Sequence, residues 1–294
     1  LTCLTALFAV TSVTAPTRAG EPMEGGVLAD SVMVWQLDLQ AMTEARLTAM
    51  AQAIAGEGGP VRDMLNDMID QRNKAVEAGV KRVMFGLSFP AGAKHPTPFV
   101  ALEPVAGADL AEVKAWQRSA MDADDMDHVE HDGVLIAVPT HGENAASQPS
   151  AERAKLVAKA MGQVAGSEIV FSLTPNATFA AMATEEAEGP VAPLVQSAMK
   201  AESISGALTI GKEMKFEMAA VARDEAAAGQ LSMMYQGGLR LLQQVMMAQM
   251  ADAEDVPDFE PMIKALTPKQ EGNRLTVTVE GDAAKALSKL IGPS

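Results

Sequence analysis

The chain of 294 residues contains a single cysteine, Cys3, and only 4% of its residues are aromatic. One cysteine cannot form a disulfide within the chain, nor can it supply the several thiolates of a structural zinc site. The sequence also lacks a P-loop, a GxGxxG and an HExxH pattern. The stretch from Gly86 to Pro90 lacks the final glycine of a nucleophile elbow. These absences exclude the strongest signatures of nucleotide-binding, zinc-dependent and acyl-transfer enzymes.

Positive charge is also scarce. There are 23 lysine and arginine residues against 38 acidic ones, which gives a net charge of −15 at pH 7. Such a chain repels a phosphate backbone, so we expect no nucleic-acid partner. Hydrophobic residues make up 48% of the sequence, enough for a folded interior.

The first 19 residues have the pattern of a secretory signal peptide. Residues 1–13 carry no charge, and residues 14–19 are mostly small or polar. Small side chains at Thr17 and Ala19 favour cleavage after Ala19, which would also remove Cys3. A buried first strand or helix is the alternative. After residue 19 no segment approaches the roughly 20 uninterrupted apolar residues of a membrane helix. We therefore expect an extracytoplasmic protein, periplasmic or secreted, without a membrane span after signal removal.

The first half of the remaining chain alternates strand and helix patterns. An apolar run at residues 32–37 predicts a strand, and two helical patterns follow it before a period of two appears at residues 83–89. Residues 99–105 predict the next strand. Asp109, with Glu112 three residues later, predicts the start of a helix. Asp132 and Gly133 predict a tight turn between strands at 127–131 and 134–138.

The second half repeats this order. Residues 169–173 predict a strand, residues 177–200 a broken helix, and two further strands precede a helix that begins after Asp224. Gly272 and Asn273 take the place of the earlier turn, and a closing helix is expected at 282–291. We therefore predict an α+β fold made of two pseudo-repeats, 20–150 and 151–294, each an antiparallel sheet covered on one face by helices. An accidental similarity between the halves of an α+β chain is the alternative.

The opening ADSVMVWQLDL at residues 29–39 and the ending EGNRLTVTVEGDAAKALSKL at residues 271–290 carry a family resemblance. With the signal peptide and the order of elements, they resemble exported bacterial proteins of unknown function of the DUF3352-like kind, frequent in planctomycetes. The resemblance implies export. It implies no activity and supplies no site residues.

The densest group of potential metal ligands lies at residues 122–132, with five aspartates, one glutamate and two histidines. Because side chains alternate along a strand, His128 and His131 would point to opposite faces and could not bind one ion. The predicted metal ligands are Asp127, His128 and Glu130. The alternative is a solvated acidic edge that discourages pairing between sheets.

Methionine is abundant, with 20 residues, and it is concentrated in the predicted helix at 225–252. One face of this helix forms a core stripe that includes Leu231, Met234 and Tyr235. A second apolar face carries Met233, Leu241, Met247 and Met250. This face could be a second core layer, an adaptable surface for a partner, or a thioether site for Cu(I).

The function predicted from these features is that of an exported, non-catalytic protein that binds another envelope or secreted component. The partner would be a protein or a second copy of the chain, and no cofactor is expected. The alternative is a metal-dependent hydrolase or metal-binding protein that uses the cluster at 122–132.

Overall fold

A computed structural model of the protein describes residues 23–48, 60–121, 126–140, 148–164, 168–187, 195–196, 198–210, 214–249 and 260–280. The predicted signal peptide and the predicted closing helix at 282–291 lie outside these ranges. The strands are β1 Ser31–Asp38, β2 Val80–Ser88, β3 Thr97–Pro104, β4 Met126–His131, β5 Val134–Pro139, β6 Ile169–Leu173, β7 Ser203–Ile210, β8 Met214–Val221, β9 Lys269–Glu271 and β10 Arg274–Glu280. The helices are η1 Glu24–Gly26, α3 Pro60–Glu77, α4 Leu110–Met121, α5 Ala151–Met161, α6 Ala177–Glu186, α8 Glu225–Gln249 and α9 Glu260–Leu266.

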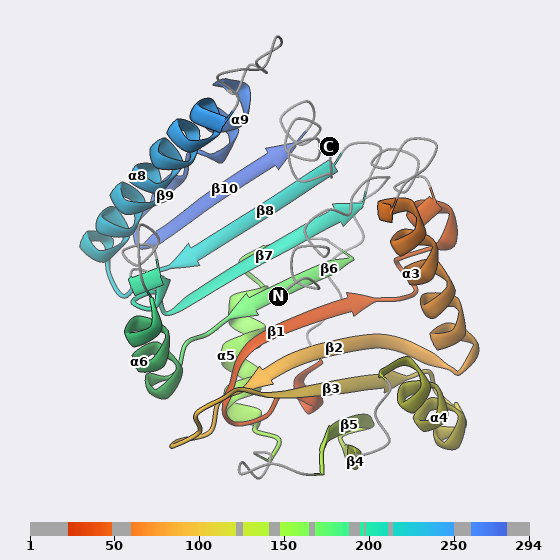
Figure 1. Ribbon diagram of the computed structural model, residues 1–294. Coiled ribbons are helices and arrows are strands. Elements are labelled where there is room, and N and C mark those ends of the chain that lie inside the picture. The colour runs from red at the N-terminus through yellow and green to blue at the C-terminus, as the bar shows by residue number, and fades with distance from the viewer. Residues whose placement is uncertain are drawn as a thin grey trace.

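All ten strands belong to one sheet, in the order β4-β5-β3-β2-β1-β6-β7-β8-β10-β9 (Figure 1). Every pairing between these strands is antiparallel. The two halves of the chain meet at the centre, where Trp35 of β1 lies opposite Phe171 of β6. The predicted α+β class with an antiparallel sheet is confirmed.

Among the described residues, each half of the chain contributes five strands, and the two sets follow one order. Counted outward from the centre, the first half runs β1, β2, β3, β5, β4, and the second runs β6, β7, β8, β10, β9. In both halves the last two strands are therefore exchanged relative to their order in the chain. The prediction of pseudo-repeats requires this common order, although the order alone does not establish a duplication.

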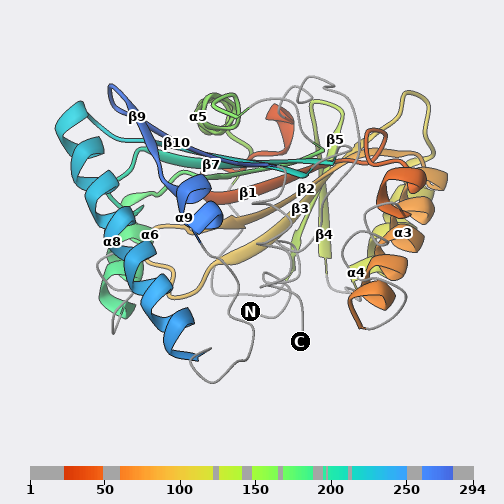
Figure 2. The same ribbon diagram turned by 90° about the horizontal axis from the view of Figure 1, so that it is seen from above.

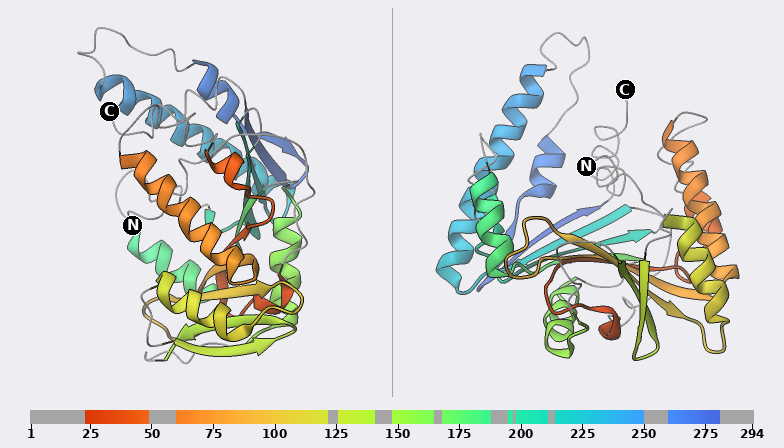
Figure 3. Two further views of the ribbon diagram at one scale, coloured as in Figure 1. Left: turned by 90° about the vertical axis from the view of Figure 1, so that its right-hand side faces the viewer. Right: turned by 60° about the horizontal axis from the view of Figure 1, so that its bottom comes forward.

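The helices cover both faces of the sheet, so the prediction that they cover one face is wrong. Figure 2 shows α5 and η1 on one side of the sheet, with α3, α4, α6, α8 and α9 on the other. On that second face the helices form two groups at opposite ends, α3 with α4 and α6 with α8 and α9 (Figure 3). A strand pattern tells which side chains are apolar, but it does not tell which helix reaches which face.

Helix α5 covers the place where the two halves join. Ala154, Val157 and Met161 of this helix are buried in the largest core cluster, which includes Val34 of β1 and Val170 of β6. On the same helix, Arg153 donates from Nε to the carbonyl of Ser31 at 2.6 Å and from Nη2 to Oγ1 of Thr174 at 2.8 Å. These bonds fasten the helix to the start of β1 and the end of β6.

The predicted turn and caps are present. Asp132 and Gly133 adopt φ angles of 49° and 73°, which the tight hairpin between β4 and β5 requires. Asp109 accepts a bond from the amide of Ala111 at 2.8 Å, and Asp224 accepts one from the amide of Ala227 at 2.7 Å. These carboxylates satisfy amides that the first turns of α4 and α8 leave unpaired.

Within the part of the chain that the structure describes, no helix combines the length and the apolar character needed for a membrane crossing.

Candidate functional site

Helix α8 is the element on which the predicted partner surface lies. Its inward face packs on the sheet through Ala228 and Leu231, which join Leu275 of β10, and through Tyr235, which joins Val277. Met233 points away from the sheet and is 68% exposed. Leu241 and Met247 belong to the same helix, but the structure describes their backbone alone, and Met250 lies outside the described residues. Of the predicted surface, Met233 is therefore the residue that the structure places in solvent.

An apolar cavity of about 290 Å³ lies between the inward face of α8 and the sheet. Its floor consists of paired inward residues, since Leu275 lies opposite Ala220 and Val277 lies opposite Met218. The short side chain of Ala220 leaves room that a larger residue would fill. The lining residues are Ala198, Ile204, Met218, Ala220, Leu231, Met234, Tyr235, Pro268, Leu275 and Val277. Among them Tyr235 alone carries a hydroxyl, and burial raises the pKa of this phenol.

A smaller cavity of about 40 Å³ adjoins the apolar one, since Leu231 and Met234 line both. It is lined further by Lys200, Ala201, Ala222, Ala227 and Gln230. Lys200 and Gln230 are exposed, so they lie at the solvent side of the small cavity. Of the described residues that line the two cavities, Lys200 is the only one with a formal charge.

The inward face of α8 follows from the sequence, but the cavities do not. The helical spacing places Leu231, Met234 and Tyr235 on one face, as the structure confirms. The sequence signal for the cavity is the small size of Ala198 and Ala220 opposite that face. That signal can be read only when the pairing of β7, β8 and β10 is known, because the pairing decides which small side chains face α8.

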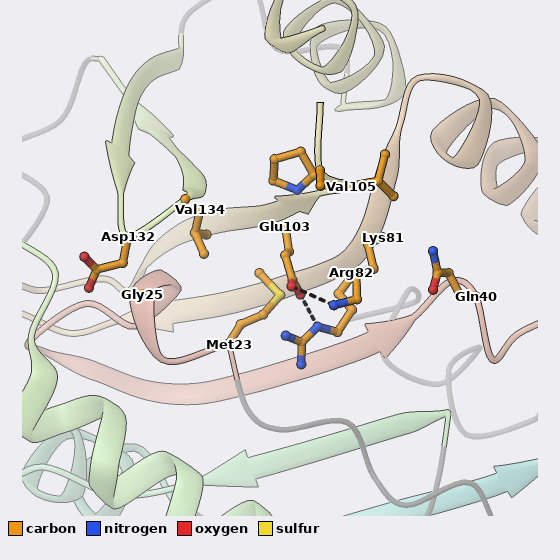
Figure 4. Close-up of a pocket in the computed structure, with 12 residues that line it drawn as sticks. Met23, Gly25, Gln40, Lys81, Arg82, Glu103, Val105, Asp132 and Val134 are labelled. Carbon is orange, nitrogen blue, oxygen red and sulfur yellow. Dashed lines mark hydrogen bonds and ion pairs between the residues drawn. The ribbon is translucent and has the colours of Figure 1, made fainter. Parts of the chain in front are cut away.

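A larger cavity of about 620 Å³ lies at the ends of β2 and β3 in the first half. Figure 4 shows Glu103, Arg82 and Lys81 meeting in it, with Asp132 on one side and Gln40 on the other. Lys81 Nζ lies 2.9 Å from Glu103 Oε1, and Arg82 Nε donates to Glu103 Oε2. Burial alone would raise the pKa of Glu103, but the hydrogen bonds and charges of Arg82 and Lys81 outweigh it and lower the pKa.

The charges in this larger cavity compensate one another. Lys81 and Arg82 face two acidic residues, Glu103 and Asp132. Glu103 already receives bonds from both cations, so this group joins neighbouring strands rather than presenting an unmatched charge to a ligand. We therefore assign these charged residues a role in stabilising the fold rather than in binding a ligand.

The structure does not bring the three predicted metal ligands together. On β4, Asp127 lies opposite Val138 and His128 lies opposite Ala137, so their side chains point to opposite faces. His128 faces α4, where its Nε2 lies 2.9 Å from Oε1 of Gln117. Burial, together with the charges of Arg118 and Lys114, lowers the pKa of His128 against the opposing effect of Asp127. Among the described residues, no three acidic, histidine or cysteine side chains gather as a metal site would require.

Comparison with known proteins gives little further information. No protein-family model matches the chain, and no curated protein does. A solved structure, crystal form III of TP0453, is similar over 93% of this chain and 98% of its own, with 10% sequence identity and a TM-score of 0.36. A similarity of that size supports no argument about function. The resemblance to DUF3352-like proteins stays a prediction.

Proposed function

We propose that this protein is an exported, non-catalytic binding protein, and that α8 together with the strands beneath it forms the binding region. The observation that carries the proposal is the apolar cavity of about 290 Å³ between α8 and β7, β8 and β10. Ligand cavities in proteins begin at about 300 Å³ and are lined mainly by apolar side chains. An engineered cavity of about 150 Å³ with a comparable lining already binds benzene.

The chemistry of the lining favours binding over catalysis. The ten described residues around the cavity include no carboxylate, imidazole, serine or thiol. Tyr235 is the sole side-chain hydroxyl among them, and burial raises the pKa of this phenol further above neutral pH. A ligand in this cavity would therefore lose its contact with water without meeting a group that transfers a proton.

Export rests on the sequence. The uncharged run at residues 1–13 and the small residues before Ala19 are typical of a signal peptide. The DUF3352-like resemblance also implies export. Cleavage would also remove Cys3, the only cysteine of the chain. This agrees with a binding protein that acts in the periplasm or outside the cell.

We also infer that residues 20–150 and 151–294 are pseudo-repeats of one α+β unit. The common strand order of the two halves supports this inference. If it holds, α8 and its cavity are an elaboration of the second unit, because the helix at the corresponding place in the first unit is α4, which has 12 residues against 25 in α8.

A partner surface on the outer face of α8 is a second candidate. Its support is Met233, a large apolar side chain that is 68% exposed. Flexible methionine side chains suit surfaces that adapt to a protein partner. The partner would be another envelope protein or a second copy of this chain.

The apolar cavity can be tested with the neutral fluorescent probe N-phenyl-1-naphthylamine. We expect the protein to bind the probe with increased fluorescence, because the probe would leave water. Ala198→Phe, which fills the cavity from one wall, should weaken binding by about tenfold or more. Ala226→Phe makes the same change at an exposed position on α8 and should bind as the unchanged protein does. Equal binding by all three proteins would overturn the assignment of the cavity.

A further inference from the structure

We infer that the ligand of the α8 cavity is a free single-chain carboxylate, with its hydrocarbon chain in the apolar cavity and its head group at Lys200. This inference rests on the proposed function. It deepens that proposal by naming the chemical class of the ligand.

The volume of the apolar cavity sets the length of the chain. A cavity of about 150 Å³ holds benzene, which has six carbon atoms. A cavity of about 290 Å³ is nearly twice as large, so it holds a chain of about ten to twelve carbon atoms. A second chain would have no space among the described lining residues, which argues against a two-chain membrane lipid.

The position of the smaller cavity beside the apolar one gives the ligand its direction. Leu231 and Met234 line both, so the two cavities adjoin, and we place the head-group end of the chain at the smaller one. The smaller cavity leads to the exposed side chains of Lys200 and Gln230. A head group would leave the apolar region at that point and remain in contact with water.

The charge at this point favours an anionic head group. Lys200 is the only charged residue among those described around the two cavities. The nearby acidic residues Glu202 and Asp224 line neither cavity, and Asp224 accepts the amide of Ala227 at 2.7 Å. The net charge of −15 opposes the approach of an anion, but at physiological ionic strength charges beyond about 8 Å are largely screened. Among the described lining residues, Lys200 is therefore the charged group that a head group at the smaller cavity would meet.

Three compounds with one ten-carbon chain separate the chain from the head group: decanoate, decan-1-ol and decyltrimethylammonium. Their affinities would be measured by displacement of N-phenyl-1-naphthylamine at pH 7.4 and 0.15 M salt, with the two ionic compounds below their micelle-forming concentrations and decan-1-ol below its solubility limit. Two variants each remove one positive charge. Lys200→Met removes it beside the cavities, and Lys264→Met removes it from an exposed position on α9 that lines neither.

We expect Lys200→Met to weaken binding of decanoate by about fivefold, the upper range for an exposed ion pair, and to leave decan-1-ol unchanged. Lys264→Met should change neither affinity. In the unchanged protein, each methylene added to a carboxylate should strengthen binding by about fourfold up to about ten to twelve carbons, with no further gain beyond. Each compound is compared with itself between variants, so the differences in solubility among the three compounds do not affect the result.

The failures of the two proposals can be told apart. If none of the ten-carbon compounds binds, the cavity is not a ligand site, and both the proposed function and this inference fall. Suppose that decan-1-ol binds, but that Lys200→Met weakens the binding of decanoate and decan-1-ol equally or changes neither. The binding function then stands, and the carboxylate assignment is overturned. Tighter binding of decyltrimethylammonium by Lys200→Met than by the unchanged protein, with decanoate unaffected, would also overturn it. Unchanged thermal melting of both variants would show that the differences come from the site.

Discussion

Two consecutive methionines on α8 lie in opposite environments. Met233 is 68% exposed, whereas Met234 lines both the apolar cavity and the small one. We predict that Met233→Glu changes the free energy of unfolding by no more than about 0.5 kcal/mol, because its carboxylate stays in water. Met234→Glu should cost about 3 kcal/mol, since its carboxylate would face an apolar lining. Urea denaturation of the two variants measures the difference.

Met233→Glu also tests the partner surface. If the outer face of α8 binds a second copy of the chain, Met233→Glu should abolish self-association in sedimentation experiments while melting remains unchanged. A large loss of stability in Met233→Glu would place this side chain in a core and remove the reason for a partner surface.

Close packing inside the sheet depends on glycines that face aromatic rings. An added Cβ at Gly206 would lie 2.0 Å from Cε1 of Phe171, its neighbour on β6. We predict that Gly206→Ala lowers the free energy of unfolding by about 1–3 kcal/mol, because the ring would have to move. The double variant Gly206→Ala/Phe171→Leu should recover part of that loss.

Gly237 on α8 provides the matched control, since an added Cβ there would meet nothing within 4 Å. Gly237→Ala should leave stability unchanged or raise it by up to about 1 kcal/mol, because alanine favours helix. Equal effects of the two alanine substitutions would contradict the packing described for β6 and β7.

The pairing of β2 with β3 is reinforced by Glu103, which receives bonds from Lys81 and Arg82. Because these bonds lower the pKa of Glu103 in the folded protein, their contribution is complete above the ordinary value of 4.5 and is lost as the pH falls through the lowered value. Glu103→Gln should therefore cost up to about 1 kcal/mol at pH 7, with the difference from the unchanged protein shrinking below about pH 4.5. Denaturation curves between pH 3 and pH 7 would show this.

Glu271→Gln serves as the control for this pH dependence, since it removes one carboxylate from an exposed position on the short strand β9. It should follow the curve of the unchanged protein. A loss in Glu103→Gln that persists undiminished at pH 3 would mean that packing, and not charge, accounts for the effect of this residue.

The elements themselves could be predicted where the determinants are local. Asp109 and Asp224 predict the starts of helices, because a carboxylate can cap the first turn. Asp132 with Gly133 predicts a hairpin, because the tight turn needs positive φ angles. Pairings between distant segments have no local signal. Residues 177–200 are predicted to be a broken helix, and in the structure α6 ends at Glu186 while residues 195–196 and 198 are again helical. The short helix α9 was not predicted, because residues 260–266 follow a longer helical pattern and contain a proline near their start.

The candidate site could be predicted only in part, for the same reason. The inward stripe of α8 follows from spacing along one helix, but the cavity requires Ala198, Ala220 and Pro268 to meet that helix from three other segments. The three predicted metal ligands do not share a face, because side chains alternate along β4 and those of Asp127 and His128 therefore point to opposite sides. The joining of both halves into one sheet through β1 and β6 was likewise beyond local patterns.

The molecule as it exists in its native host should lack the first 19 residues. The uncharged run at residues 1–13 motivates this prediction, and small side chains at Thr17 and Ala19 place the cleavage. Intact mass spectrometry of the protein from that host should give a chain that begins at Gly20 or very near it. A cytoplasmic species that retains Leu1 would contradict export.

The binding function proposed for this protein requires that the cavity under α8 take up an apolar ligand. Methionine methyl groups report on this directly, because Met218 of β8 and Met234 of α8 line the cavity. Met233, also on α8, lies in solvent. NMR spectra of protein labelled with ¹³C at the methionine methyl groups would be recorded during titration with decan-1-ol. We predict saturable shifts of the Met218 and Met234 signals, with the Met233 signal unchanged. Signals of Met218 and Met234 that do not move, or that move no more than that of Met233, would contradict the binding function proposed for this protein.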